Sequence, residues 1–387
     1  MCGGWSTDGH CILPQVTAAG ASDVLRVIEP NLIGPSGHYA EFVRALASRA
    51  DGSFTKIEVV ASPRAAGFLE SLSGEVPVVP IVMPSGVLAE TRAIRASLNE
   101  GRQTLVLTAS ASHVLLAEIT CTFDPKLLNH LSFFVHWPLA KPSERLGLAL
   151  GRRARANANF IVPTRGVRDA LRAADCEHVT QVAYPATRAL GAPMRTPFRH
   201  LLMAGAARIN KGLDVVAELA EILAREQGST DRAWPLLVQV SPKHIDRHGS
   251  REDATVARLL AAKYSGLVAD PSAPDRSAYA DRFRGALVLA PYERAKFANG
   301  VSGVVLDALL HGAPVVATEG TWAGDVVARF DAGIAIRERT GAQLSTAVAR
   351  ILARWDRYAQ NAAVASEALA REHDPRGLAR VIAAHRG

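Results

Sequence analysis

The stretch LLMAGAARINKG, residues 201–212, joins a short apolar run to a polar turn. Residues 201–204 are continuously hydrophobic, as in a strand buried on both faces, and Gly205 ends the run. Arg208 and Lys211 follow three residues apart, directly before a helical pattern. A strand that turns into a helix over so few residues is one unit of a parallel α/β sheet. Two cations beside the free N–H groups of a helix start favour a bound anion.

The same alternation of strands and helices extends in both directions along the chain. Strands are predicted at residues 24–29, 56–61, 76–83, 104–108, 132–136, 160–162, 179–183, 201–204, 236–240, 286–290 and 314–318. Helices are predicted at residues 211–225, 252–264, 303–310, 341–353 and from 357 onward, with a break at Pro375. This alternation indicates parallel sheets covered by helices on both faces.

The chain divides near residues 184–199, YPATRALGAPMRTPFR, which contain three prolines and no periodicity. A length of 387 residues also suits two cores better than one. We predict two Rossmann-like doubly wound α/β domains facing a cleft, where the carboxyl ends of strands bind ligands. The predicted parts are an N-terminal Rossmann-like domain (1–185), a linker (186–199), a C-terminal Rossmann-like domain (200–355) and C-terminal helices that pack back toward the first domain (356–387).

The composition is that of a soluble globular protein, with 48% hydrophobic and 21% charged residues. No apolar run approaches the ~20 residues of a membrane-spanning helix, and we find no signal-peptide pattern in the first 20 residues. The cysteines at positions 2, 11, 121 and 176 lack paired or metal-like spacing, so we expect reduced thiols in the cytoplasm.

The net charge of +7 is moderate, and its basic residues gather in one stretch of the first half. They are Lys141, Arg145, Arg152, Arg153, Arg155, Arg165, Arg168 and Arg172. Such a face attracts an anionic membrane surface or a diphosphate-bearing acceptor, and the alternative is an ordinary solvated helix surface. Because no aromatic residues are interleaved, we expect no nucleic acid partner. We therefore predict a cytoplasmic protein, with a peripheral position at the inner membrane as the alternative.

A second informative segment, residues 291–318, places a polar loop and a helix start between two strands. Ser302 and Gly303 at that start offer unpaired N–H groups to an anion. Asp307 lies one turn into the helix, where its carboxylate can accept both hydroxyls of a ribose. The alternative is that Asp307 is a first-turn acid favoured by the helix dipole. For Arg208 and Lys211, the alternative is that both are solvated cations on the surface.

These two segments resemble the retaining GT-B glycosyltransferases of the large family 4. GAARINKG, residues 205–212, resembles the glycine, arginine and lysine turn of that family. Asn299 to Asp307, NGVSGVVLD, resembles its E-x7-E motif, although Asn299 replaces the first acid and an aspartate the second. Glu293 lies nearby and would replace the lost acid if its loop folds back. Residues 319–333 resemble the loop and helix that close the site.

Two features of the first half match the same family. NLIGPSGH, residues 31–38, resembles a Gly-rich turn whose backbone touches the donor diphosphate, with Gly37 at the matching position. FFVHWP, residues 133–138, brings His136 to the position of a histidine that lines the donor-sugar site.

The resemblance implies a metal-independent hexosyltransferase without a cofactor. Residues 1–185 would form its acceptor-side domain, and residues 200–355 its nucleotide-sugar-binding domain. Its substrate would be a UDP- or GDP-linked sugar, and its acceptor a saccharide or polyprenol-linked molecule of bacterial polysaccharide or glycolipid assembly. The implied catalytic residues are His136, Arg208 and Lys211. The implied donor-binding residues are Gly37, Gly205, Asn299, Ser302, Gly303 and Asp307.

Four other functions are alternatives to a transferase. Asn299 favours a catalytically weak partner subunit that binds nucleotide sugar without turnover, and a sugar-nucleotide epimerase is a further alternative with the same fold. A nicotinamide dehydrogenase needs G-x-G-x-x-G after a strand, and a serine hydrolase needs G-x-S-x-G. The sequence contains neither pattern in that context.

Overall fold

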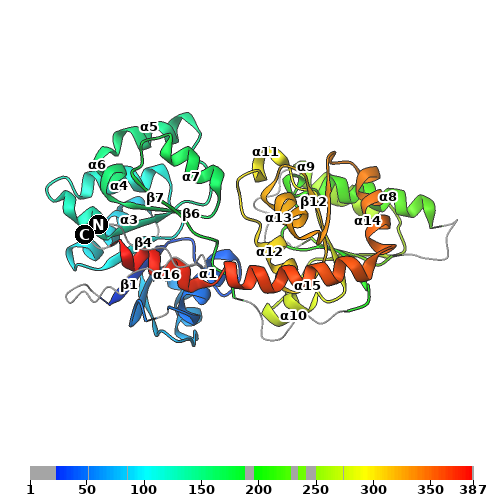
Figure 1. Ribbon diagram of the computed structural model, residues 1–387, viewed down its shortest axis with the longest axis horizontal. Helices are drawn as coiled ribbons and strands as arrows, with labels where there is room; N and C mark the ends of the chain where they lie inside the picture. Colours follow the sequence, from blue (N-terminus) through cyan, green and yellow to red (C-terminus); the bar gives the residue numbers. More distant parts are fainter. Residues whose placement is uncertain are drawn as a thin grey trace, which may run out of the picture.

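The computed structural model describes residues 23–50, 52–84, 86–187, 196–227, 234–240, 250–272 and 274–385. These residues form two α/β units that lie next to each other (Figure 1). Cys2, Cys11, the amino-terminal segment screened for a signal peptide and residues 188–195 of the predicted linker lie outside the described residues.

The first unit has a parallel sheet in the order β3-β2-β1-β4-β5-β6-β7. Its strands are β1 (Val24–Glu29), β2 (Lys56–Ala61), β3 (Val78–Val82), β4 (Gln103–Val106), β5 (Leu131–Phe134), β6 (Asn159–Val162) and β7 (His178–Gln181). Its α-helices are α1 (His38–Ser48), α2 (Ala66–Glu70), α3 (Val87–Asn99), α4 (Ala111–Thr120), α5 (Pro142–Leu150), α6 (Arg152–Asn157) and α7 (Arg165–Arg172). The strand order reverses between β1 and β4, which marks the switch point of a doubly wound sheet.

The second unit repeats this topology in the order β10-β9-β8-β11-β12-β13, with its switch point between β8 and β11. Its strands are β8 (His200–Met203), β9 (Leu236–Gln239), β10 (Leu267–Asp270), β11 (Ala286–Ala290), β12 (Val315–Thr318) and β13 (Gly333–Ile336). Its helices are η3 (Ile209–Lys211), α8 (Leu213–Glu226), α9 (Ser250–Ala261), α10 (Arg276–Asp281), α11 (Arg294–Phe297), α12 (Gly303–Leu310), α13 (Trp322–Phe330) and α14 (Gly341–Leu352). The predicted fold class, two Rossmann-like doubly wound domains, is confirmed.

The sequence prediction missed two strands of this sheet and placed the start of the helix after β8 too early. β10 and β13, the two edge strands of this sheet, were missed; both are only four residues long and include partly exposed residues. The helix predicted from residue 211 begins at Leu213 instead, because Gly212 takes a left-handed conformation. The preceding residues form the short 3₁₀ turn η3.

The C-terminal segment connects the two units (Figure 1). α15 (Trp355–Glu372) lies along the second unit, and its buried face packs with the core that α12 also enters. α16 begins at Pro375 and carries Leu378 and Ile382 into the core of the first unit, where both side chains are fully buried. The chain thus returns to the domain in which it began.

In the ranges that the structure describes, no helix combines the length and the apolar character needed to cross a bilayer.

Candidate functional site

The turn after β8 meets the start of α12 at the switch point of the second sheet. Gly205 has a φ of +78°, and its N–H donates to Gln239 Oε1 at 2.9 Å. A Cβ at position 205 would lie 3.1 Å from the Val304 side chain and 4.0 Å from Lys211 Nζ. Only glycine suits this backbone conformation and this close approach. The Lys211 ammonium group and the first turn of α12 therefore converge on Gly205.

Lys211 and Arg208 form a cationic pair in this turn. Burial, and then the charge of Arg208, lower the pKa of Lys211 to about 8. No described carboxylate lies within 4 Å of the Lys211 ammonium group. A partly buried cation beside a like charge costs free energy unless a negative group balances it. The pair is accordingly suited to bind an anion.

Arg339 holds the η3 turn against the end of β11. Its guanidinium donates to Ile209 O at 2.9 Å, to Asp214 Oδ1 at 3.0 Å and to Pro291 O at 2.8 Å. The backbone N–H of Glu293 also donates to Asn210 O, at 2.9 Å. These bonds join the turns that follow the two central strands, so the cations have a fixed position at the switch point.

The start of α12 keeps backbone donors available. Ser302 is the N-cap, and its hydroxyl accepts from the N–H of Val305 at 3.3 Å and donates to the Tyr292 hydroxyl at 3.2 Å. Among the described residues, none accepts from the N–H groups of Gly303 and Val304. Gly303 is exposed, and a Cβ added there would meet open space. The Ser302 side chain is thus committed to capping, and the backbone of Gly303 and Val304 faces outward.

Asp307 is half-buried one turn further along α12, and the Tyr279 hydroxyl donates to its Oδ2 at 3.0 Å. Burial, reinforced by the charge of Glu41, raises the pKa of Asp307 to about 7. Glu41 belongs to α1 of the first unit, and it pairs with Arg276 of the second unit at 3.5 Å. The carboxylate therefore lies close to the other domain and changes its charge near neutral pH.

His136 follows β5 at the carboxyl end of the first sheet and is 7% exposed. Its Nε2 contacts Leu107 O at 2.9 Å, and because a carbonyl only accepts, the proton is on Nε2 and Nδ1 keeps its lone pair. Burial, and then His38, lower the pKa of His136 to about 3, so the ring is neutral. Gly37, with a φ of +95° and open space beside it, precedes His38, whose ring centroid lies 6.1 Å from that of His136.

Asn299 lies at the contact between the two units. Its carbonyl oxygen accepts from Thr164 Oγ1 at 2.8 Å. Its Oδ1 lies 1.8 Å from the place that a Cβ on Gly166 would take, so a larger residue at position 166 would displace the Asn299 side chain. Position 299 therefore packs against the start of α7.

The structure thus groups the candidate residues in three places. Gly205, Arg208, Lys211, Ser302 and Gly303 surround the switch point of the second sheet, and Asp307 is one turn away. Gly37 and His136 lie on the carboxyl edge of the first sheet. Asn299 lies where the two edges touch.

Sequence reasoning missed the residues that support these groups. They are Gln239, Tyr279, Tyr292 and Arg339. Only Gln239 carried a signal, as a polar residue near the end of the apolar strand predicted at 236–240.

Comparisons with known proteins identify the fold. No family model and no curated protein matches the chain. Among solved structures, Anabaena HepE in complex with UDP and glucose has 13% identity and a TM-score of 0.66, over 94% of this chain and 98% of that one. Sucrose-phosphate synthase from Thermosynechococcus elongatus has 15% identity and a TM-score of 0.65, over 89% and 94%. WaaG, a glycosyltransferase involved in lipopolysaccharide biosynthesis, has 14% identity and a TM-score of 0.62, over 92% and 99%. The chain has the GT-B fold.

Replacing Lys211 with Met should stabilise the ligand-free protein at pH 7. The pKa of Lys211 is lowered in the folded state, so below about pH 8 its charge destabilises that state, and this cost fades as the pH rises toward the unfolded value. The thermal midpoint should rise by roughly 2–4 °C for each kcal/mol removed, whereas the stabilisation by added pyrophosphate should fall. Lys296→Met, at an exposed position on α11, is the control. A lower midpoint for Lys211→Met than for the natural protein would contradict the interpretation.

Proposed function

We propose that the protein is a glycosyltransferase that takes a sugar from a nucleotide-diphosphate donor held mainly by its second domain. The observation that supports this best is the convergence of Lys211 and the start of α12 on Gly205, with no described acid beside Lys211. A diphosphate supplies the negative charge that this arrangement lacks.

Lys211 and Arg208 would promote the departure of the leaving group. When the bond between the sugar and the diphosphate breaks, negative charge grows on the phosphate oxygen. The two cations and the N–H groups of Gly303 and Val304 would stabilise it at fixed positions. No metal ion is required in this proposal, because the side chains and backbone provide the positive potential. Asp307, held by Tyr279, would accept the ribose hydroxyls.

His136 would orient the donor sugar. Its neutral ring presents Nδ1 as an acceptor, which suits a sugar hydroxyl. A group with so low a pKa is poorly suited to exchange protons at neutral pH. We therefore propose transfer with retention, in which the acceptor hydroxyl attacks on the face that the diphosphate leaves and passes its proton to a phosphate oxygen.

The substrates follow from this chemistry and from the resemblance in fold. We propose a UDP- or GDP-linked hexose as donor, and UDP is the first choice because HepE was crystallised with UDP and glucose. We propose a saccharide or polyprenol-linked acceptor in bacterial polysaccharide or glycolipid assembly. The protein would act in the cytoplasm.

Lys211→Ala should weaken the binding of UDP-glucose or GDP-mannose about tenfold or more, as expected for one lost charge-assisted bond. Titration calorimetry measures this, with Lys296→Ala as the exposed control. An unchanged affinity would place the donor elsewhere. Incubation with radiolabelled donor and acceptor mixtures then separates the functions, because binding without acceptor-dependent transfer would indicate a partner subunit that lacks turnover.

The pH dependence of kcat/KM with the best nucleotide sugar should be bell-shaped, with its maximum between about pH 7 and pH 8. Asp307 must lose its proton to accept ribose hydroxyls, and its pKa is about 7. Lys211 must keep its proton, and its pKa is about 8. Asp307→Asn should abolish the acidic limb and keep the basic one. An acidic limb that persists in Asp307→Asn would assign it to another group.

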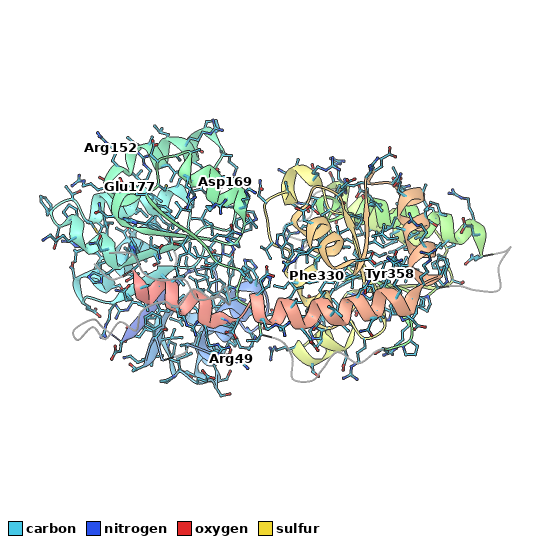
Figure 2. All side chains as sticks on the ribbon, viewed as in Figure 1. Arg49, Arg152, Asp169, Glu177, Phe330 and Tyr358 are labelled. Carbon is cyan, nitrogen blue, oxygen red and sulfur yellow. The ribbon has the colours of Figure 1, made fainter. Side chains whose placement is uncertain are left out.

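We also propose that the α4 and α5 side of the first domain contacts anionic membranes. Ile119, Phe123, Leu146 and Leu150 are each more than half exposed there. Of the basic stretch, Arg153, Arg155, Arg165 and Arg168 pair with acids, so the whole stretch is not a bare cationic face. Arg145 and Arg152 have no described carboxylate within 4 Å, and Figure 2 shows Arg152 at the outer edge of this domain. Exposed apolar groups next to such cations suit an anionic bilayer surface.

Flotation with phosphatidylglycerol vesicles tests this surface. The double variant Phe123→Asp/Leu146→Asp should lower the bound fraction about fivefold or more, because both changes remove apolar contact and add repelled charge. Leu260→Asp, at an exposed position on α9, is the matched control. Equal flotation of all variants, or none of the natural protein, would remove the membrane from the proposal.

A further inference from the structure

A cavity opens at the switch point of the first sheet, in the other domain from the turn that holds Arg208 and Lys211. Its volume is about 270 Å³, and it lies at the carboxyl ends of β1 and β4. The polar residues of its wall are Asn31, Glu90, Thr108 and His113, and its apolar residues include Ile28 and Val106. In a doubly wound sheet this is the position where a ligand is expected.

Thr108 presents only lone pairs to this cavity. Its hydroxyl donates to Glu29 Oε2 at 2.5 Å. Glu29 is fully buried behind it and also accepts from the N–H of Asn31 at 3.0 Å. Burial raises the pKa of Glu29, and its bonds to Thr108 and Asn31 oppose that rise. With its hydrogen committed, the Thr108 oxygen can act toward a ligand only as an acceptor.

Glu90, held by His113, adds a second hydrogen-bond acceptor to the cavity wall. His113 Nδ1 accepts from the N–H of Ser110 at 3.1 Å, which caps α4, so the ring proton is on Nε2. That Nε2 donates to Glu90 Oε2 at 2.9 Å, and this bond lowers the pKa of Glu90. The bond from His113 Nε2 to Glu90 is not needed to cap α4. Its effect is to fix an ionised carboxylate in the wall, whose remaining lone pairs can accept.

We propose that this cavity binds the acceptor substrate and selects an uncharged, hydroxyl-bearing sugar or cyclitol ring over a phosphorylated one. The proposal rests on the transferase function proposed above. Hydroxyl groups can donate to Thr108 and Glu90, and the C–H face of a ring can pack on Ile28 and Val106. Among the residues that the structure describes, no Lys or Arg lines the cavity, so a phosphate would meet the Glu90 charge without compensation. The volume lies just below the ~300–1,000 Å³ of drug-sized ligand sites, which suits one ring.

Saturation-transfer NMR on the UDP-loaded protein tests this selection directly. The probes are glucose, galactose, mannose, myo-inositol and glucose 6-phosphate. At least one uncharged probe should bind, and glucose 6-phosphate should bind at least fivefold more weakly than that probe. Glu90→Gln keeps the shape and should weaken the bound uncharged probe about fivefold, as one charge-assisted bond is lost. Glu90→Lys should shift the preference toward glucose 6-phosphate. Glu70→Gln, at an exposed carboxylate on α2, is the control.

The outcomes separate this inference from the proposed function. If UDP binds but no uncharged probe does up to its solubility limit, or glucose 6-phosphate binds equally or better, the selection is wrong. The selection is also wrong if Glu90→Gln leaves the affinity for the uncharged probe unchanged. If neither UDP nor GDP binds to the natural protein, the donor site and the transferase function fail, whereas direct binding of the sugars still reports on the cavity.

Discussion

The positive charge held at the η3 turn is the constraint on which the rest of the site depends. Lys211 is partly buried beside Arg208, and the lowered pKa of Lys211 shows that the fold opposes this arrangement. The arrangement persists because Arg339 and Glu293 tie the turn to the end of β11. The free energy that holds the cations in place comes from the apolar cores on both sides of the second sheet. An arriving anion relieves the repulsion, so stability and ligand binding are coupled through this turn.

The contacts between the domains are of two kinds. The facing edges meet through a few polar contacts, Thr164 with Asn299 and Glu41 with Arg276. The pair of Glu41 and Arg276 is largely exposed, so it contributes little free energy. α16 instead buries Leu378 and Ile382 in the first core, and removing either side chain would cost about 2–5 kcal/mol. The C-terminal segment thus joins the domains through buried apolar contacts, whereas the facing edges meet through polar ones.

The sequence predicted the fold class and most strands because buried parallel strands are continuously apolar, as in residues 24–29 and 286–290. It did not predict β10 and β13, which are short edge strands with partly exposed residues. Candidate residues at strand ends, such as Gly205 and Lys211, could be found because turns after strands carry local signals. Tyr279 and Arg339 could not, because they reach Asp307 and the η3 turn from 28 and 130 residues away in the chain. For Asn299, the local motif gave no sign of its contact with the other domain.

The two domains use one topology with opposite electrostatics. In each sheet the order reverses between two central strands, and the residues that follow those strands form the walls of a site. After β8 the wall has Arg208 and Lys211, whereas the cavity at β1 and β4 has Thr108 after β4 and the Glu90 carboxylate of α3. On the functions proposed above, a diphosphate would be attracted by the cations after β8 and disfavoured beside Glu90, and a neutral polyol would suit the wall that offers acceptors. Side chains around the switch points of two similarly ordered sheets would thus sort the two proposed substrates by their charge.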